Sequence, residues 1–310
     1  MKPFVIVNPE AGGGLGKKLW PGISKEIKQQ VGVFSFEETN AIGHARVLAA
    51  EAAQSGHTCI IAYGGDGTIH EVVNGLHDSK VSPLPELGII SVGTGGDFVK
   101  TLGLPKNLKE QIRIIANFHT RTVDVGHVEY RNQQGKKEER LFVNIIDAGL
   151  GAEVVRNLQG ARKLFGRRLC YLTATVQACM TWSPRKVRIQ MDHPADEKRW
   201  PEKILAIVIA NGQYFGGGMP IAPSASAEDG YFDLIVLGKM HPLMIPIAVP
   251  LLYSRQVIRL PNVVTDRVRT LSLTSEENVN LEIDGEPIGS LPATFKVIPH
   301  YLTIKAPVKP

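Results

Sequence analysis

Short apolar stretches alternate with helix-favouring stretches through the first part of the chain, up to about residue 120. This order is typical of an α/β sheet, in which buried strands are followed by amphipathic helices. The pattern predicts strands at Phe4–Val7, Val33–Glu37, Thr58–Tyr63 and Leu87–Val92, and helices at Leu19–Gln30, His44–Ala53, Ile69–Leu76 and Lys106–Asn117.

After Arg121 the pattern changes to short apolar runs separated by polar loops, as in an antiparallel sheet. Two pairs of runs flank charged loops and predict β-hairpins: Thr122–Tyr130 with Arg140–Ile146, and Lys186–Met191 with Lys203–Ala210. Further strands are predicted at Tyr231–Leu237, Thr270–Leu273, Val279–Ile283, Thr294–Ile298 and Tyr301–Ile304, with helices near Glu153–Met180 and Met244–Ile258. We expect an α/β domain at residues 1–124, which the C-terminal strand at 296–310 could complete, and a β domain at residues 125–295.

The composition indicates a folded protein with a mild positive charge. Apolar residues make up 43% of the 310 residues, enough for packed cores in two domains. The net charge of +5 suits an anionic ligand or a membrane surface and falls short of a dedicated nucleic-acid binder.

The cysteines and the apolar segments favour a soluble cytoplasmic protein. Cys59, Cys170 and Cys179 form no C-x-x-C pair and no zinc pattern, which suggests reduced thiols. The N-terminus runs directly into a predicted strand, so we expect no signal peptide. Pro242–Leu260, the most apolar long segment, contains two internal prolines and Arg255, so no membrane span is expected.

Three predicted strands of the first domain end in glycine-rich or polar turns, at Asn8–Gly16, Gly64–Thr68 and Gly93–Gly96. Ligands of open α/β sheets bind at the carboxyl ends of the strands, where glycines let backbone N–H groups approach phosphate oxygens. The usual nucleotide motifs are absent: a Walker A loop would need Gly at Ala11 and Ser or Thr at Lys18, and no G-x-G-x-x-G occurs.

The central turn carries the most specific chemistry of the three. The Asp66 carboxylate could reach a metal-bound phosphate, and Thr68 could bind a phosphate or cap the next helix. A tight strand-to-helix turn with an Asp cap is the structural alternative.

Six motifs occur along the chain in a fixed order. They are Asn8-Pro9-x-Ala11-Gly12, Thr39-x-x-x-Gly43-His44-Ala45, Gly64-Gly65-Asp66-Gly67-Thr68, Gly93-Thr94-Gly95-Gly96-Asp97-Phe98, Pro223-x-Ala225-x-x-x-Asp229-Gly230-x-x-Asp233 and Ile283-Asp284-Gly285-Glu286. In this order they resemble the motifs of the diacylglycerol/sphingosine lipid kinase catalytic domain, above all in the compact bacterial lipid kinases. The resemblance covers nearly the whole chain. It implies an N-terminal α/β nucleotide-binding domain of the kind shared by NAD kinases and diacylglycerol kinases, and a C-terminal antiparallel β-sandwich that takes the lipid.

The resemblance also implies an ATP site in the first domain. Its residues would be Asn8, Pro9, Glu10, Ala11, Gly12, Thr39, Gly65, Asp66, Gly67, Thr68, Ile69, His70, Glu71, Thr94 and Asp97. Asp66 and Asp97 are the acidic groups expected nearest the metal and phosphates, although Asp97 could instead cap a helix. Gly96 and His70 stand where the family usually has Asn, which leaves nucleotide preference open.

The proton acceptor of the family corresponds to Glu286, with Asp284 two residues earlier. If the strand at Val279–Ile283 continued, the two carboxylates would face the same side and form a pair. A turn between two strands at Asp284-Gly285 is the structural alternative.

The resemblance implies a structural Mg²⁺ held by the Asp229 carboxylate and the backbone carbonyls of Ser226 and Tyr231, for which a plain β-turn is the alternative. The basic stretch Arg162–Arg168 and the apolar stretch Leu169–Trp182 could contact an anionic membrane and an acyl chain. A core helix with a solvated basic start explains the same pattern.

The sequence therefore favours an ATP- and Mg²⁺-dependent lipid kinase of phospholipid metabolism, which transfers the γ-phosphate to a hydroxyl of diacylglycerol or a similar lipid. It would use Glu286, Asp284 and Asp66 in catalysis and work at the inner face of the membrane, without nucleic acid. A homodimer is left open. The alternatives are an NAD kinase-like enzyme and an inactive, nucleotide-responsive membrane-binding protein.

Overall fold

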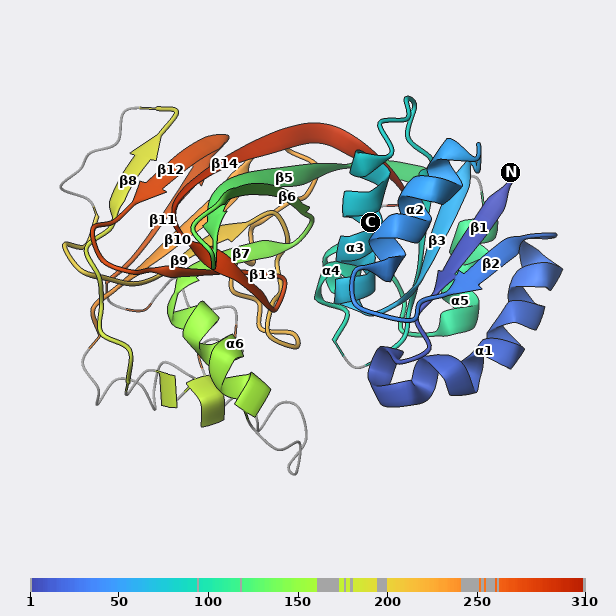
Figure 1. Ribbon diagram of the computed structural model, residues 1–310, viewed down its shortest axis with the longest axis horizontal. Helices are drawn as coiled ribbons and strands as arrows, with labels where there is room; N and C mark the ends of the chain where they lie inside the picture. Colours follow the sequence, from blue (N-terminus) through green and yellow to red (C-terminus); the bar gives the residue numbers. More distant parts are fainter. Residues whose placement is uncertain are drawn as a thin grey trace. The chain divides into compact units, whose positions relative to one another are not determined.

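A computed structural model describes residues 2–93, 95–117, 119–160, 173–175, 177–178, 181–193, 200–240, 251, 254, 260 and 262–308. The predicted basic stretch Arg162–Arg168 and nearly all of the predicted helix Met244–Ile258 lie outside the described residues. The chain divides into two compact units, one of Met1–Val125 with Pro299–Pro310 and the other of Gly126–Ile298. Each unit is described by itself (Figure 1).

The first unit is built on a parallel sheet. Its strand order is β14-β4-β3-β1-β2. Strand bounds are β1 Pro3–Val7, β2 Ser35–Glu38, β3 Cys59–Gly64, β4 Glu86–Ser91 and β14 Glu286–Lys305, of which only the end lies in this unit. Helix bounds are α1 Ala11–Gln30, α2 His44–Gln54, α3 Asp66–Asp78, α4 Asp97–Thr101 and α5 Leu108–Ala116.

The central strands of the first unit's sheet are buried on both faces, whereas β2 at its edge is exposed. Alternate residues such as Val5, Ile61 and Tyr63 pack into a core with Trp20 of α1 and Ile112 of α5. The residues between them are buried as well, so the central strands read as unbroken apolar runs. Helices α2 and α3 lie side by side (Figure 1), and a Cβ at Gly75 of α3 would come within 2.1 Å of the Arg46 carbonyl oxygen. Glycine at this position lets the two helices approach closely.

The C-terminal end of β14 completes the first unit. Ile304 pairs in parallel with Leu87 of β4. The neighbouring Lys305 ammonium is buried and lies 2.9 Å from a Glu86 carboxylate oxygen. A buried ammonium needs such a partner, so the last strand is held by a charge pair as well as by its backbone.

The second unit is a mainly antiparallel β structure. Its main strand order is β11-β10-β9-β7-β13-β14, while β12 joins β14 to β8, and β5 joins β14 to β6. The bounds are β5 Thr120–Asn132, β6 Lys137–Phe142, β7 Ile145–Gly149, α6 Leu150–Gly160, β8 Arg188–Met191, β9 Ile204–Ala210, β10 Phe232–Gly238, β11 Val263–Val268, β12 Thr270–Thr274 and β13 Asn280–Ile283. Apolar side chains of most of these strands form one core, in which Phe142 stacks on Phe232.

The first predicted hairpin is confirmed, and the second is wrong. Strands β5 and β6 pair from Gly126↔Phe142 to Arg131↔Lys137, although the predicted run Arg140–Ile146 is divided between β6 and β7. Strand β8 pairs with β12, and β9 pairs with β7 and β10, because long-range pairing here overrides adjacency in sequence. The two predicted strands near the C-terminus are parts of the single strand β14, and β11 was not predicted.

Candidate active site

The first two predicted loops of the first unit are joined by side chains. The Asn8 side-chain amide donates to the Thr68 hydroxyl oxygen at 2.9 Å, and the Asn8 backbone N–H donates to the Tyr63 carbonyl at 2.9 Å. The Asn8 amide oxygen accepts from the Glu10 N–H at 3.0 Å. Asn8 therefore links the loop after β1 to the loop after β3 and shapes the next turn of its own loop.

Close backbone approaches explain two glycines of these loops. A Cβ at Gly64 would come within 2.3 Å of the Thr68 hydroxyl oxygen, so no larger residue fits there. Gly12 has φ +64°, and its added Cβ would lie 3.2 Å from the Gly93 Cα. The loops after β1 and β4 thus lie against each other, with backbone rather than side chains at their contact.

Asp66 holds the third loop in place. It begins α3, and one of its carboxylate oxygens accepts from the Gly96 N–H at 2.9 Å and the Asp97 N–H at 3.1 Å. The sequence suggested a carboxylate directed at a metal-bound phosphate, whereas this oxygen is engaged by backbone donors. An anion that accepts two N–H groups stabilises a tight turn strongly.

The backbone conformation of Gly96 accounts for one departure from the family pattern. Gly96 has φ +64° and ψ +47°, in the left-handed region. Glycine adopts this region without strain, and Asn is among the residues that tolerate it best. The exchange of Asn for Gly at this position therefore conserves the backbone conformation.

Two further acidic residues of the predicted ATP site, Asp97 and Glu71, have partners in the protein. Asp97 is the first residue of α4, and its carboxylate accepts from the Lys100 ammonium at 2.8 Å. Glu71 accepts from the Gly43 N–H at 2.9 Å and the Ala45 N–H at 3.0 Å, so it binds the first turn of α2. Glu71 is thus a helix-anchoring group, a role that the motif Gly43-His44-Ala45 before a predicted helix could have indicated.

Two further predicted positions are Thr39, which follows β2, and His70, which lies within α3. The Thr39 N–H donates to the Val7 carbonyl at 2.8 Å, which places Thr39 at the end of β1. His70 is buried within α3, where its carbonyl accepts from the Asn74 side chain at 2.9 Å. Thr94 lies outside the described residues. The structure thus gathers Asn8, Thr39, Asp66, Thr68 and Asp97 at the carboxyl edge of one parallel sheet.

In the second unit, Asp284 and Gly285 form the turn that joins β13 to β14. Ile283 pairs directly with Glu286, and the two turn residues have φ +48° and +93°. The turn between two strands is therefore observed, whereas a strand that continues past Ile283 and pairs Asp284 with Glu286 is not. Left-handed conformations at both central residues are those that a tight hairpin needs, and an Asp-Gly pair adopts them readily.

The turn is fastened to the start of β7. The Asp284 carboxylate accepts from the Ile145 N–H at 2.9 Å, and the Asp284 N–H donates to the Ile145 carbonyl at 3.1 Å. Glu286, the first residue of β14, is half-buried and remains partly accessible to solvent. A carboxylate on a fixed turn with solvent access can take a proton from an incoming hydroxyl.

Two buried carboxyl groups lie next to this turn and were not predicted as site residues. Glu282 of β13 is opposite Asp147 of β7, and each is 2% exposed. Burial raises the pKa of Asp147 to about 7, although the Gly151 and Ala152 N–H groups favour its charged form. Burial and then the nearby Asp147 charge hold the pKa of Glu282 well above its usual range. Glu282 could have been predicted as a buried acid, because it lies within the otherwise largely apolar predicted strand Val279–Ile283.

The predicted magnesium ligands have a different partner. The Asp229 carboxylate accepts from the Tyr231 N–H at 3.1 Å and forms an ion pair with Arg267. The Arg267 guanidinium also lies over the Tyr231 ring, 4.7 Å from its centroid. Oxygen ligands suit a hard cation, but here a guanidinium already neutralises the one carboxylate. As arranged, these residues do not fit the Mg²⁺ site that the resemblance implies.

No metal-binding group emerges elsewhere in the described part of the chain. Among the described residues, no three His, Cys, Asp or Glu side chains are grouped so that they could hold a metal ion. In the apolar stretch Leu169–Trp182, Ala174 and Ala178 are buried in a core with Ile145 and Leu150. This favours the core-helix alternative for the few residues of that stretch that are described.

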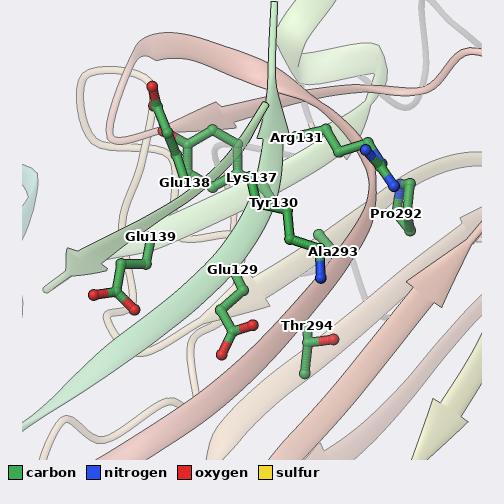
Figure 2. Close-up of a pocket in the computed structure, with 9 residues that line it drawn as sticks. All are labelled: Glu129, Tyr130, Arg131, Lys137, Glu138, Glu139, Pro292, Ala293 and Thr294. Atoms are coloured by element: carbon green, nitrogen blue, oxygen red, sulfur yellow. The ribbon is translucent and has the colours of Figure 1, made fainter. Parts of the chain in front are cut away.

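The second unit also has a pocket between the β5–β6 hairpin and β14 (Figure 2). It is lined by charged residues of the β5–β6 hairpin, among them Glu129, Arg131 and Glu139, and by Thr294 of β14. It contains none of the predicted site residues. Each unit thus has its own group of candidate residues: the loops after β1, β3 and β4 in the first unit, and the turn with Glu286 in the second.

Comparison with known proteins covers both units. The diacylglycerol kinase catalytic domain family matches residues 2–128, and the YegS C-terminal NAD kinase beta sandwich-like domain family matches residues 144–306. The diacylglycerol kinase of Staphylococcus carnosus (strain TM300) is 27% identical over 303 residues, which are 98% of this chain and 94% of the relative. That of Bacillus subtilis (strain 168) is 28% identical over 304 residues, 98% of this chain and 95% of the relative.

A solved structure shows the same fold. A Bacillus anthracis str. Sterne protein, provisionally named a diacylglycerol kinase, matches with a TM-score of 0.81 and 26% identity, covering 99% of this chain and 95% of its own. The expected fold, an α/β domain followed by a β-sandwich-like domain, is confirmed. The chain therefore belongs to the lipid kinase family that joins a diacylglycerol kinase catalytic domain to a YegS-type C-terminal domain.

Proposed function

We propose that this lipid kinase transfers the γ-phosphate of MgATP to the free hydroxyl of diacylglycerol. The arrangement of the loops after β1, β3 and β4 carries the proposal, because Asn8 and Asp66 tie all three together at one sheet edge. Such an edge, with glycine backbone and the N-terminus of α3, suits a polyphosphate. The relatives named diacylglycerol kinase support the choice of acceptor.

The residues of the chain would have distinct parts in the reaction. Phosphoryl transfer depends mainly on position and charge, so the loops after β1 and β3 would hold the phosphates. Asp66 would keep the third loop closed on them. Glu286 would accept the proton of the lipid hydroxyl. The hydroxyl oxygen would form the new P–O bond to the γ-phosphorus, and ADP would leave with the electrons of the broken P–O bond. The hydroxyl oxygen must then lie about 3–3.5 Å from the γ-phosphorus.

The lipid acceptor implies contact with a membrane surface. None of the helices that the structure describes has the length and apolar character needed to span a bilayer. The net charge of +5 would favour peripheral binding to anionic lipid at the inner face of the membrane. Binding to vesicles should then rise with their anionic lipid content and fall with salt.

A radiolabelled ATP assay tests the proposed acceptor. The purified protein is incubated with labelled ATP and Mg²⁺ in the presence of diacylglycerol in mixed micelles, of other lipid alcohols, or of NAD. Labelled phosphatidic acid is the expected product. Labelled NADP would establish the NAD kinase alternative, and no labelled product with tight ATP binding would establish the inactive regulatory protein. The variant Glu286→Gln serves as the control for catalysis by this site.

A further inference from the structure

Two groups of the second unit hold the Asp284-Gly285 turn, the Ile145 backbone and the Glu282 carboxyl. Asp284 bonds to the Ile145 backbone, as described above. Gly285 donates its N–H to a carboxyl oxygen of Glu282. Glu282 in turn is the direct cross-strand neighbour of Asp147. The residue that follows this turn is Glu286, the proposed proton acceptor.

The charged groups that raise the pKa of Glu282 are all acidic. The charged side chains that act on it are Asp147 of β7, Asp284 of the turn and Glu286 of β14. From α6, Glu153 is buried as well and accepts from the Asn280 side chain at 3.2 Å. Two carboxylates buried side by side would repel each other strongly, so the pair keeps a proton near neutral pH.

The proton belongs on Glu282. Asp147 accepts from the Gly151 N–H at 2.8 Å at the start of α6, and such donors stabilise the charged form of its carboxyl. Glu282 has one backbone donor, Gly285, and more negative neighbours. A neutral Glu282 can still accept from the Gly285 N–H through its carbonyl oxygen.

We propose that Glu282, kept neutral beside Asp147, is a positioning residue that fixes the Asp284-Gly285 turn and thereby the direction of Glu286. The proposal rests on the proposed function of Glu286 as the proton acceptor. Loss of the proton from Glu282 would add one negative charge, which would be the second in the buried pair and would also act on Glu286. Glu282 would thus hold Glu286 in position only while Glu282 is protonated, and it would take no part in the proton transfer itself.

Paired variants test this role. Glu282→Gln keeps the volume and the acceptor oxygen but cannot ionise, whereas Glu282→Leu removes the acceptor for the Gly285 N–H. We expect Glu282→Gln to keep kcat within about twofold at neutral pH and to lose the alkaline decline of kcat that Glu282 causes in the wild type. Glu282→Leu should lower kcat on the order of 10-fold to 100-fold through misplacement of Glu286, with KM for ATP unchanged.

The matched control is Glu153→Gln, which replaces another buried carboxyl, one that accepts from the Asn280 side chain of β13. It should leave kcat and its pH profile unchanged. Circular dichroism and the melting temperature establish that each variant is folded. If Glu282→Leu does not fold, the pH profile of Glu282→Gln decides the matter.

The outcomes separate this proposal from the proposed function. Wild-type kcat in Glu282→Leu, or an unchanged alkaline decline in Glu282→Gln, overturns the positioning role even when Glu286→Gln is inactive. Phosphorylation of lipid by the wild type with full activity in Glu286→Gln overturns the proposed base first, and the positioning role with it. A loss in Glu282→Leu that Glu282→Gln does not share supports the positioning role.

Discussion

Asn8 and Thr68, sixty positions apart, are joined by a hydrogen bond of 2.9 Å from the Asn8 amide to the Thr68 hydroxyl. Thr68 is buried beside Gly64, where a Cβ would collide with its hydroxyl. The bond therefore needs Asn8 from the motif after β1 and both Gly64 and Thr68 from the motif after β3. It connects the loops after β1 and β3 at the carboxyl edge of the sheet in the first unit.

Replacing Asp66 by Asn should weaken the use of ATP. The neutral amide keeps an acceptor oxygen for the Gly96 and Asp97 N–H groups but loses the charge that strengthens both bonds. Charge-assisted bonds exceed neutral ones by roughly 1–2 kcal/mol, which corresponds to about a 10-fold fall in kcat/KM for ATP. Steady-state kinetics with ATP varied measures this. Full activity at wild-type KM would show that the third loop closes without Asp66.

Replacing Glu286 by Gln should abolish catalysis and spare nucleotide binding. The amide has nearly the same volume but cannot accept the hydroxyl proton. A general base contributes typically about 10²–10⁴-fold, and this loss should fall on kcat. Calorimetric titration with a non-hydrolysable ATP analogue should give a wild-type Kd. Near-normal turnover would exclude Glu286 as the base and direct the search to Asp284.

Gly96 should accept Asn better than a β-branched residue. Its left-handed backbone costs an ordinary L residue roughly 1–2 kcal/mol, and its Cβ would lie 3.2 Å from the Ser91 hydroxyl oxygen. Urea unfolding should show Gly96→Asn close to the wild type and Gly96→Val lower by about that amount. Equal stability of the two variants would contradict the backbone explanation of this departure from the family pattern.

Chelation should leave the second unit stable. Since Arg267 neutralises Asp229, EDTA should not change the melting temperature of the protein in the absence of nucleotide. Arg267→Met removes that charge and should lower the melting temperature by about 2–4 °C, the shift expected for roughly 1 kcal/mol in a domain of this size. Mg²⁺ should restore part of the loss. A marked fall with EDTA in the wild type would show that a bound cation displaces Arg267.

The Asp147 carboxyl should make stability fall as the pH rises towards neutrality. Its pKa in the folded protein is about 7 because of burial, against an ordinary value of 3.8. The folded state therefore binds more protons than the unfolded state between these values, and stability declines with pH across that window, by at most about 1.4 kcal/mol per pH unit for one group. Urea unfolding from pH 4 to about pH 8 should show this slope reduced in Asp147→Asn. An equal slope in both proteins would show that the carboxyl has an ordinary pKa.

Local chemistry explains what the sequence predicted well. Gly12, Gly93 and Gly96 have positive φ angles and Gly64 lies against the nearby Thr68, so these glycines follow from local backbone geometry that is visible in the chain. The Asp284-Gly285 turn was visible for the same reason, since an Asp-Gly pair adopts left-handed conformations readily.

Long-range pairing explains what the sequence did not predict. The bond from Asp66 to Gly96 depends on the parallel register of β3 with β4, and the Asp147–Glu282 pair depends on that of β7 with β13. Neither register is encoded near the residues concerned. The same holds for Arg267 on β11, a strand that no local pattern indicated. Partners of known site residues are therefore harder to predict than the site residues themselves.

The position of Lys305 has a consequence for the order of synthesis. The strand that covers the outer edge of β4, and the ammonium that pairs with Glu86, come from the last residues of the described chain. A growing chain that has already made β1 to β4 must wait for nearly all of the second unit before this edge is closed. Until then the edge of β4 offers its unpaired backbone to other chains. A fragment limited to residues 2–128 would keep that edge open permanently, so we expect it to aggregate where the full chain does not.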